Sequence, residues 1–351
     1  MKIIEDSIAA FASFIWGYPL LLLLIGGGIY LLILSRFLPF RYFGHAIQVL
    51  RGKYDDPDDP GQISHFQALT TALSATVGMG NISGVAVAIA MGGPGAIFWM
   101  WISAVVGMST KFFTSSLAIM YRGKDSEGEL QGGPMYFITE GLGKKWKPLA
   151  IFFSACAMIG ALPVFNVNQL TQAVNDILLK PNGVEVTNYT NLVIGVFLVI
   201  ITSIVVLGGL KRIGKVTSRL VPSMVLLYFI LVVVILIVHI DVVPKYFLMI
   251  FTDAFSADFI KEESVLGGVV GALIILGIKR GAFSNEAGVG TAPMAHGAAK
   301  TDEPIREGLV AMLGPFIDTI IVCTLTALAI LVTGVWQTSD TNGVSLTATA
   351  F

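Results

Sequence analysis

Eight long apolar stretches follow one another along this chain, and they constrain its fold more than any other feature. They cover residues 11–34, 66–91, 95–121, 148–179, 190–210, 218–240, 264–298 and 308–336. Each has about 20 residues or more, the length that an α-helix needs to cross about 30 Å of hydrocarbon. Their apolar residues are continuous rather than alternating, which favours a helix bundle over a barrel. The sequence therefore predicts an all-α, polytopic membrane protein.

The composition agrees with this class. Hydrophobic residues make up 55% of the chain and charged residues 13%, about half of the roughly 25% typical of soluble domains. The net charge of −1 gives no indication of a nucleic-acid partner. The first apolar stretch is too long for the core of a signal peptide, and we expect it to be a retained helix in the lipid bilayer.

The basic residues predict an orientation. Fifteen of the 22 Lys and Arg residues lie in the segments that follow spans one, three, five and seven, whereas four lie on the opposite side. Basic residues gather in cytoplasmic loops. We therefore expect these loops in the cytoplasm and the N-terminus outside, in the cell (cytoplasmic) membrane.

Residues 36–54 differ from the spans. Apolar and polar side chains alternate there at helical spacing, namely Phe43, Ile47 and Leu50 with Arg41, Gln48 and Arg51. This pattern predicts an amphipathic helix on the inner membrane surface. The last residues, "NGVSLTATAF", resemble the entry to another span, so we expect the sequence to be a C-terminally truncated part of a longer protein.

Two spans contain related, glycine-rich motifs. Asn81-Ile-Ser-Gly-Val occurs in span two and Asn285-Glu-Ala-Gly-Val in span seven. These spans have opposite predicted orientations, and related motifs in opposite orientation are typical of an inverted-topology repeat. We expect an extra N-terminal helix and an interfacial helix over 1–60, a first five-helix repeat over 61–247, and the incomplete start of a second repeat over 262–351.

The motifs predict broken helices. An unwound backbone at membrane depth survives only where protein encloses it or where it lines a watery cavity. The break exposes N–H groups, which attract a carboxylate, and carbonyls, which coordinate a small cation. A zwitterion with a cation is the natural cargo. Alternatively, Gly80 and Gly84 have the spacing that only allows helices to pack closely.

Several segments resemble the alanine or glycine:cation symporter family, also called sodium:alanine symporters. They include "GGPGAIFWMWISAVVG" (92–107), "GGPMYFITEGLG" and "FSNEAGVGTAPMAHGAAK", and they occur in family order. The resemblance implies the amino acid–polyamine–organocation superfamily and a LeuT-type inverted repeat. It also implies symport of alanine or glycine into the cell with Na⁺ or sometimes H⁺.

The resemblance also implies site residues. The amides of Met79 and Gly80 would hold the substrate carboxylate beside Asn81, and the carbonyls of Ser74 and Val77 would face the cation. Across the pocket, the implied substrate-binding residues are Phe283, Ser284, Asn285 and Gln169. His65 stands where the family usually has proline, and we expect it to be peripheral.

Ionisable residues within spans are costly and are functional candidates. We expect Glu286 and Asp318 to take part in gating or coupling, and Lys111 to extend its amine towards the membrane surface. No catalytic residue, cofactor or metal is predicted other than the transported cation. A proton-coupled permease, a passive permease or channel, and an intramembrane enzyme are the alternatives. Na⁺ and H⁺, alanine and glycine, and every oligomeric state remain open.

Overall fold

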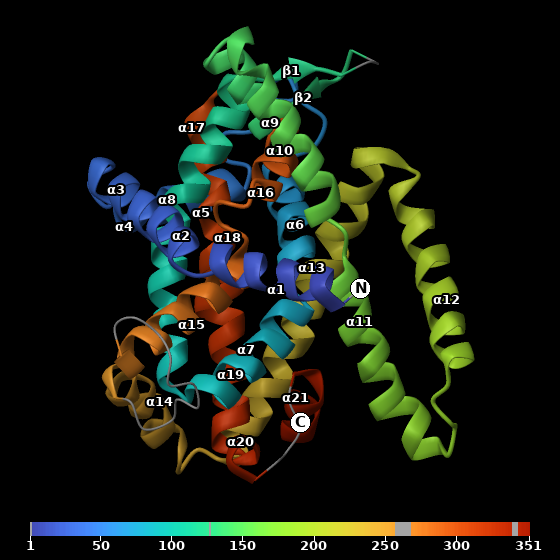
Figure 1. Ribbon diagram of the computed structural model, residues 1–351. Coiled ribbons are helices and arrows are strands. Elements are labelled where there is room, and N and C mark those ends of the chain that lie inside the picture. The colour runs from blue at the N-terminus through green and yellow to red at the C-terminus, as the bar shows by residue number, and fades with distance from the viewer. Residues whose placement is uncertain (1, 126–127, 257–267, 339–342) are drawn as a thin grey trace.

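The chain folds into a helical bundle in a computed structural model that describes residues 2–125, 128–256, 268–338 and 343–351 (Figure 1). The helices are α1 Lys2–Ile15, α2 Tyr18–Leu20, α3 Gly27–Leu34, α4 Leu38–Arg41, α5 Phe43–Leu50, α6 His65–Thr76, α7 Met79–Gly92, α8 Gly95–Met120, α9 Pro134–Tyr136, α10 Lys147–Gly160, α11 Val164–Ala173, α12 Asn188–Val206, α13 Gly209–Val238, α14 Val243–Thr252, α15 Gly268–Asn285, α16 Thr291–His296, α17 Pro304–Ala311, α18 Leu313–Pro315, α19 Thr324–Val332, α20 Val335–Thr338 and α21 Val344–Ala350.

Shorter elements join several of these helices. Strands β1 (Gly123–Lys124) and β2 (Leu130–Gln131) pair in antiparallel fashion, with Gly123 opposite Gln131. π-Helical turns span Leu21–Gly26, Phe137–Gly141, Val174–Leu179 and Phe316–Cys323, and 3₁₀ turns span Lys144–Trp146, Lys180–Asn182 and Asp253–Phe255.

Most of the predicted spans are confirmed. Among the residues that the structure describes, six helices are long and apolar enough to cross a membrane, and the bent pair α6 and α7 makes a seventh. The six are Glu5–Leu34, Gly95–Met120, Lys144–Asn182, Asn188–Val206, Gly209–Val238 and Pro304–Val332. The predicted span 264–298 consists of α15 and α16, which residues 286–290 separate. Its first residues, 264–267, lie outside the described ranges.

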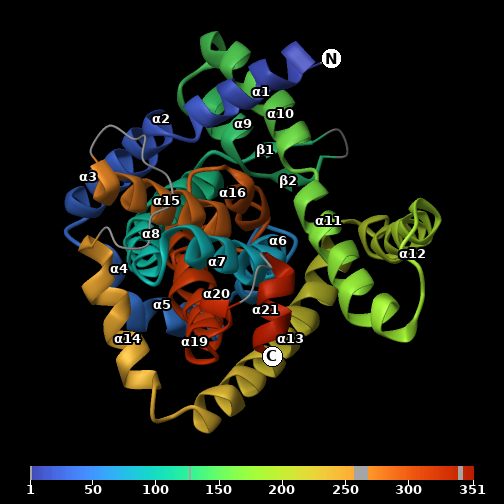
Figure 2. The same cartoon turned by 60° about the horizontal axis from the view of Figure 1, so that its bottom comes forward.

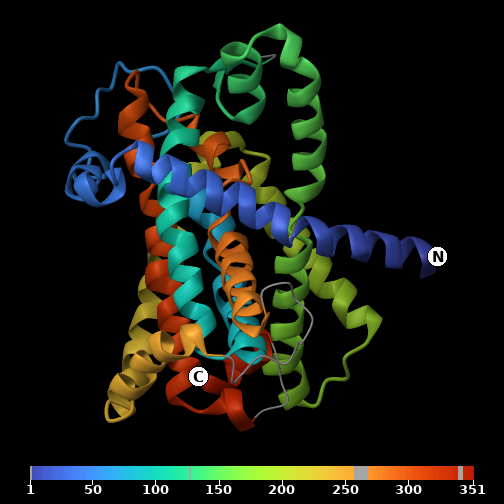
Figure 3. The ribbon, with the colours of Figure 1, turned by 60° about the vertical axis from the view of Figure 1, so that its left-hand side comes forward.

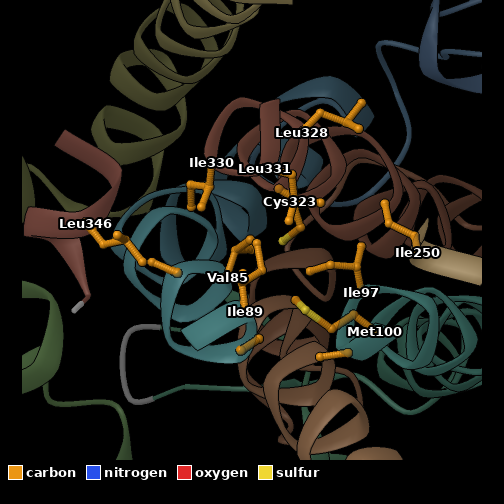
Figure 4. Packing of buried hydrophobic residues seen from close by; sticks show 14 of the residues in the cluster. Val85, Ile89, Ile97, Met100, Ile250, Cys323, Leu328, Ile330, Leu331 and Leu346 are labelled. Carbon is orange, nitrogen blue, oxygen red and sulfur yellow. The ribbon is translucent and has the colours of Figure 1, made fainter. Parts of the chain in front are cut away.

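The core gathers around α7, α8 and α19. Of the most apolar part of α8, 61% is buried inside the protein, whereas none of α12 is, so α8 is central and α12 is peripheral. Figure 2 shows α12 at the outer edge, beyond α11. Figure 4 shows how Val85 and Ile89 of α7 pack against Ile97 and Met100 of α8 and against Leu331 of α19.

The amphipathic segment is helical, as predicted, and forms α4 and α5. Phe43, Ile47 and Leu50 are partly buried, and Gln48 is exposed. Helix α5 packs against α17. The N-terminal helices α1–α3 run across the bundle at a steep angle to α8 (Figure 3), and Leu24 of this segment reaches the second helix break described below.

Candidate functional site

The first predicted break is confirmed between α6 and α7. The two half-helices meet at a bend of 44° around Val77 and Gly78. The sequence supplies a local cap for the second half, because the Gly78 N–H donates to Asn81 Oδ1 at 2.8 Å. This is one of the two hydrogen bonds of a capping box, in which a side chain at the third helical position returns to the residue before the helix.

The start of α7 presents backbone donors. Met79 and Gly80 are its first two residues, and N–H groups at these positions have no partner within a helix. A Cβ added to Gly80 would meet only the Ser284 Cα, at 3.9 Å, and one added to Gly84 would meet nothing within 4 Å. The close-packing alternative is therefore wrong for these glycines, whereas the space beside Gly80 is free.

The second predicted break is confirmed after α15, at the motif that begins with Asn285. Phe283, Ser284 and Asn285 are the last residues of α15 and directly precede this break. The chain then turns through positive φ values at Glu286 (52°), Gly288 (90°) and Gly290 (100°). Asn285 initiates this turn because its Oδ1 accepts from the Ala287 N–H at 3.0 Å.

The two asparagine motifs meet at their breaks. Asn81 Nδ2 donates to Ser284 Oγ at 3.1 Å, although the two residues are 203 positions apart. It also lies 2.7 Å from Asp318 Oδ1 and 3.1 Å from the Asp318 carbonyl, with Cys323 Sγ at 3.4 Å. Asn81 is fully buried, so the amide that a lipid would not tolerate is satisfied within protein.

Asp318 organises the facing side of this contact. Its Oδ2 accepts from Ser284 Oγ at 2.7 Å and from Thr319 Oγ1 at 2.8 Å, and Thr319 accepts from Asn285 Nδ2 at 3.2 Å. Asp318 is fully buried and lies on the π-helical turn Phe316–Cys323. Such turns inside α-helices occur frequently at functional sites. We call Asn81, Ser284, Asn285, Asp318 and Thr319 the polar network.

Gln169 joins the site from α11. Its Oε1 accepts from Ser83 Oγ at 2.6 Å and from the Val344 N–H at 3.4 Å. Ser83 lies two residues after Asn81 on α7, so Gln169 approaches the first break from a separate helix. Phe283 packs edge-on against Phe165 of the same helix, with ring centroids 5.2 Å apart.

The remaining predicted residues lie around this centre. Val77 and Gly78 border a cavity of about 50 Å³ with Tyr228 and Val322. The Ser74 side chain is exposed and donates to the Thr71 carbonyl of its own helix, so the site can use only the Ser74 backbone. Glu286 is partly exposed and accepts from Thr291 Oγ1 across the second break.

The sequence analysis missed three members of the site. Thr319 and Cys323 contact the polar network, and Lys111 of α8 is buried, with 2% of its surface exposed, and faces Asp318 electrostatically. The expectation that Lys111 extends to the membrane surface is therefore wrong. The signal available was the acidic residue in span eight, because a buried amine at membrane depth needs an opposite charge.

A larger cavity leads away from the first break. It has a volume of about 390 Å³ and lies between α6 and α16. Thr71, Ala75 and Thr76 line one wall, and Thr291 and Ala295 line the other. Its walls are the two half-helices on the predicted cytoplasmic side of the breaks, so we call it the inner cavity.

Two broken helices that meet through buried polar side chains suit a membrane transporter, and the comparison with known proteins decides the family. The sodium:alanine symporter family matches residues 1–351, the whole chain. The chain belongs to this family. Its members are symporters and not enzymes, so the chain is a multi-pass membrane protein and a cation-coupled amino-acid transporter.

Individual relatives support this assignment. The sodium/alanine symporter AgcS of Methanococcus maripaludis is 44% identical over 97% of this chain and 74% of its own length. An uncharacterized transporter of Haemophilus influenzae is 42% identical over 99% of the chain and 74% of its own length. The probable sodium/glutamine symporter GlnT of Bacillus subtilis is 35% identical over 99% and 69%.

Proposed function

We propose that the protein carries alanine or glycine into the cell together with Na⁺, by alternating access around the two breaks. The proposal places the breaks in two inverted repeats, 61–247 and the part of the second repeat within 262–351. It also places the protein in the cytoplasmic membrane with the N-terminus outside. One set of helices would rock against the others around a fixed site, as in other transporters with broken helices.

One observation carries the proposal, namely that the polar network contains more acceptors than hydrogens. Asn81 Nδ2 has two hydrogens, yet four acceptors surround it, two of them from Asp318. The Asp318 carboxylate adds a negative charge that accepts from Asn81, Ser284 and Thr319, and Lys111 supplies a positive charge near it. Acceptors that lack a hydrogen can bind a cation or accept from an ammonium group.

The substrate would bind between the two breaks. Its carboxylate would accept from the Met79 and Gly80 amides at the positive end of α7, which favours an anion. Its ammonium group would meet the last carbonyls of α15, at Phe283, Ser284 and Asn285, with Gln169 as a further partner. A Cβ added to Gly80 would lie 3.9 Å from the Ser284 Cα, and this close approach of the two helices favours a substrate with a small side chain. The similarity to the sodium/alanine symporter AgcS supports alanine and sodium, and the similarity to the probable sodium/glutamine symporter GlnT makes glutamine the competing substrate.

The coupling cation would bind close to the substrate. The carbonyls of Ser74 and Val77 belong to the end of α6, where carbonyls lack helical partners. Oxygen ligands of this kind suit Na⁺, and Asp318 would attract it to this depth. Inward movement of one charge supplies about 2.3 kcal/mol per 100 mV of membrane potential.

Uptake into proteoliposomes carrying the full-length protein tests this function. We expect an inward Na⁺ gradient to accumulate labelled alanine above equilibrium, whereas an equal K⁺ gradient does not. Unlabelled glycine should compete better than unlabelled glutamine. The Gly80→Leu variant should abolish uptake because its side chain fills the space against Ser284, and Gly84→Ala should retain it because its methyl group meets nothing.

A second candidate, proton coupling, is favoured by the buried Asp318 carboxylate, which becomes neutral when it binds a proton and which shares its buried surroundings with Lys111. Accumulation driven by a pH gradient without Na⁺ would support it and would overturn Na⁺ coupling. Equilibration of alanine whatever the ion gradient would instead indicate a passive permease.

A further inference from the structure

Three buried titratable side chains form a cluster outside the polar network. His65 is the first residue of α6, His296 the last of α16, and Glu307 lies on α17. Their exposed fractions are 2%, 0% and 0%. His65 Nδ1 faces Glu307 Oε2, and His296 Nδ1 faces Glu307 Oε1, so one carboxylate joins two imidazoles. The expectation that His65 is peripheral is therefore wrong.

The geometry fixes where protons lie in this cluster. A carboxylate accepts at both oxygens, so each imidazole carries a hydrogen on Nδ1. His65 Nε2 lies 3.8 Å from Asp55 Oδ1, and a proton there makes His65 a cation between two carboxylates. His296 Nε2 is buried and has no hydrogen-bond partner. The His296 Nε2 atom is therefore the ring position at which a further proton would be added.

The surrounding charges come from three other segments. Asp55 precedes α6 in the chain, Arg122 follows α8, and Arg306 lies beside Glu307 on α17; Asp55 and Arg306 act on His65, and Arg122 acts on Glu307. Arg122 also donates to the carbonyls of Gly297, Ala299, Thr301 and Pro60. These contacts hold Arg122 beside the cluster, so its positive charge stays there. If His296 also became an imidazolium, it would share one buried anion, Glu307, with His65.

The cluster joins the two walls of the inner cavity. His65 lies six residues before Thr71 on α6, and His296 directly follows Ala295 on α16. The backbone adds to this connection, since Gln62 N donates to the Ala298 carbonyl at 2.8 Å and Lys300 N to the Ile63 carbonyl at 2.7 Å. Glu307 is thus the only side chain among the described residues whose carboxylate hydrogen-bonds to both half-helices.

We propose that His65, Glu307 and His296 form a proton-binding site that controls the opening of the inner cavity. With one proton on His65, the cluster is balanced and holds α6 beside α16. A second proton on His296 Nε2 places two cations on one buried carboxylate. The repulsion between these two cations falls when α6 and α16 separate and water enters. Acid on the cytoplasmic side therefore opens the cavity.

Chemical labelling of a cysteine in the cavity tests this site. The full-length protein would carry Ala72→Cys, a buried position in the wall of the cavity, with Cys156 and any other exposed cysteine replaced by serine. A charged, water-soluble maleimide would report access to Ala72→Cys, and its rate would be divided by that of Lys144→Cys, an exposed position that does not line the cavity. This ratio removes the effect of pH on the thiol itself.

We expect the labelling ratio to rise about fivefold between pH 7.5 and 5.5. His296→Asn should abolish this rise, because its amide still donates to Glu307 but takes no proton. His45→Asn is the matched control, since the His45 ring packs edge-on against Tyr54 and has no contact with Glu307, so the rise should remain intact. Glu307→Gln should give a high ratio at both pH values.

The proposal is overturned if the ratio does not rise in the parent protein, or if the rise persists in His296→Asn. The proton-site proposal rests on the same moving half-helices as the proposed symport. The labelling experiment, however, measures access to the inner cavity and not transport. A pH-dependent cavity without Na⁺-driven uptake would therefore reject the symport mechanism alone, and the converse would reject this proton site alone.

Discussion

The two helix breaks are stabilised in different ways. The first has two residues, Val77 and Gly78, and Asn81 of the following half-helix closes it from within. The second has five residues, 286–290, and relies on positive φ values. Groups from outside enclose it, since a Cβ on Gly288 would lie 2.3 Å from Leu24 and one on Gly290 would lie 2.7 Å from Phe153.

Exposure follows the same division. Val77 in the first break is 6% exposed, whereas Val289 in the second is 49% exposed. A short break capped by its own helix keeps its geometry when neighbours move. A longer break held by neighbouring helices changes when they do. We infer that the first break fixes the position of the substrate and that the second transmits movement.

The largest expected effect distinguishes Asp318 of the polar network, which contacts Asn81 beside the first break, from Glu286 within the second break. Asp318→Asn keeps the size of the side chain but removes the charge from the fully buried network, and we expect uptake to fall about 100-fold or more, as for loss of a buried charged partner. Glu286→Gln should change uptake less than about threefold, because Glu286 is partly exposed and makes one hydrogen bond.

Initial rates of alanine uptake, normalised to the amount of protein in the membrane, measure both variants. If Asp318→Asn and Glu286→Gln lost equal amounts of uptake, the result would contradict our assignment of Asp318 to the binding centre and of Glu286 to a peripheral turn.

A smaller effect concerns glycine in the second break. Gly290→Ala should lower stability by about 2 kcal/mol, because a non-glycine residue at positive φ costs about 1–3 kcal/mol and its Cβ meets Phe153. Gly84→Ala, which follows the first break in α7, should be neutral or stabilising by up to about 1 kcal/mol. Thermal unfolding of the detergent-solubilised protein gives both values, and a destabilised Gly84→Ala would contradict the open space seen there.

The smallest effect compares the two asparagines. Asn81→Ala removes the acceptor of the Gly78 N–H and one of the donors to the Asp318 carboxylate. The free energy of unfolding should fall by about 2 kcal/mol. Asn285→Ala loses the bonds to Thr319 and Ala287 and should cost about 1 kcal/mol. The same unfolding measurement ranks them, and an equal or reversed ranking would mean that the second break depends on its side-chain cap as much as the first does.

The sequence predicted the features that local chemistry determines. The glycine pattern located the first break, and the long apolar stretches located most of the spans. The helical spacing of Phe43, Ile47 and Leu50 identified α5. Each of these signals lies within about 20 neighbouring residues, so no knowledge of the tertiary fold was needed.

The features that were missed depend on distant contacts. His65 and Glu307 are 242 positions apart, and their contact has no signature in either local sequence. Lys111 was misjudged because its depth depends on the helices around α8. The contacts of Ser284 with Asp318 and of Asn285 with Thr319 were also missed, because each joins residues that are 34 positions apart.

The aromatic contact between Phe283 and the N-terminal segment has an optical consequence. Phe283 lies between Phe165 and the indole of Trp16, whose ring centroid is 6.2 Å from its own. Indole emission shifts in wavelength with the polarity around the ring. Trp16 is therefore a natural fluorophore close to the second break. In a variant whose other four tryptophans are replaced by phenylalanine, its emission spectrum would report the arrangement of that break without any attached dye.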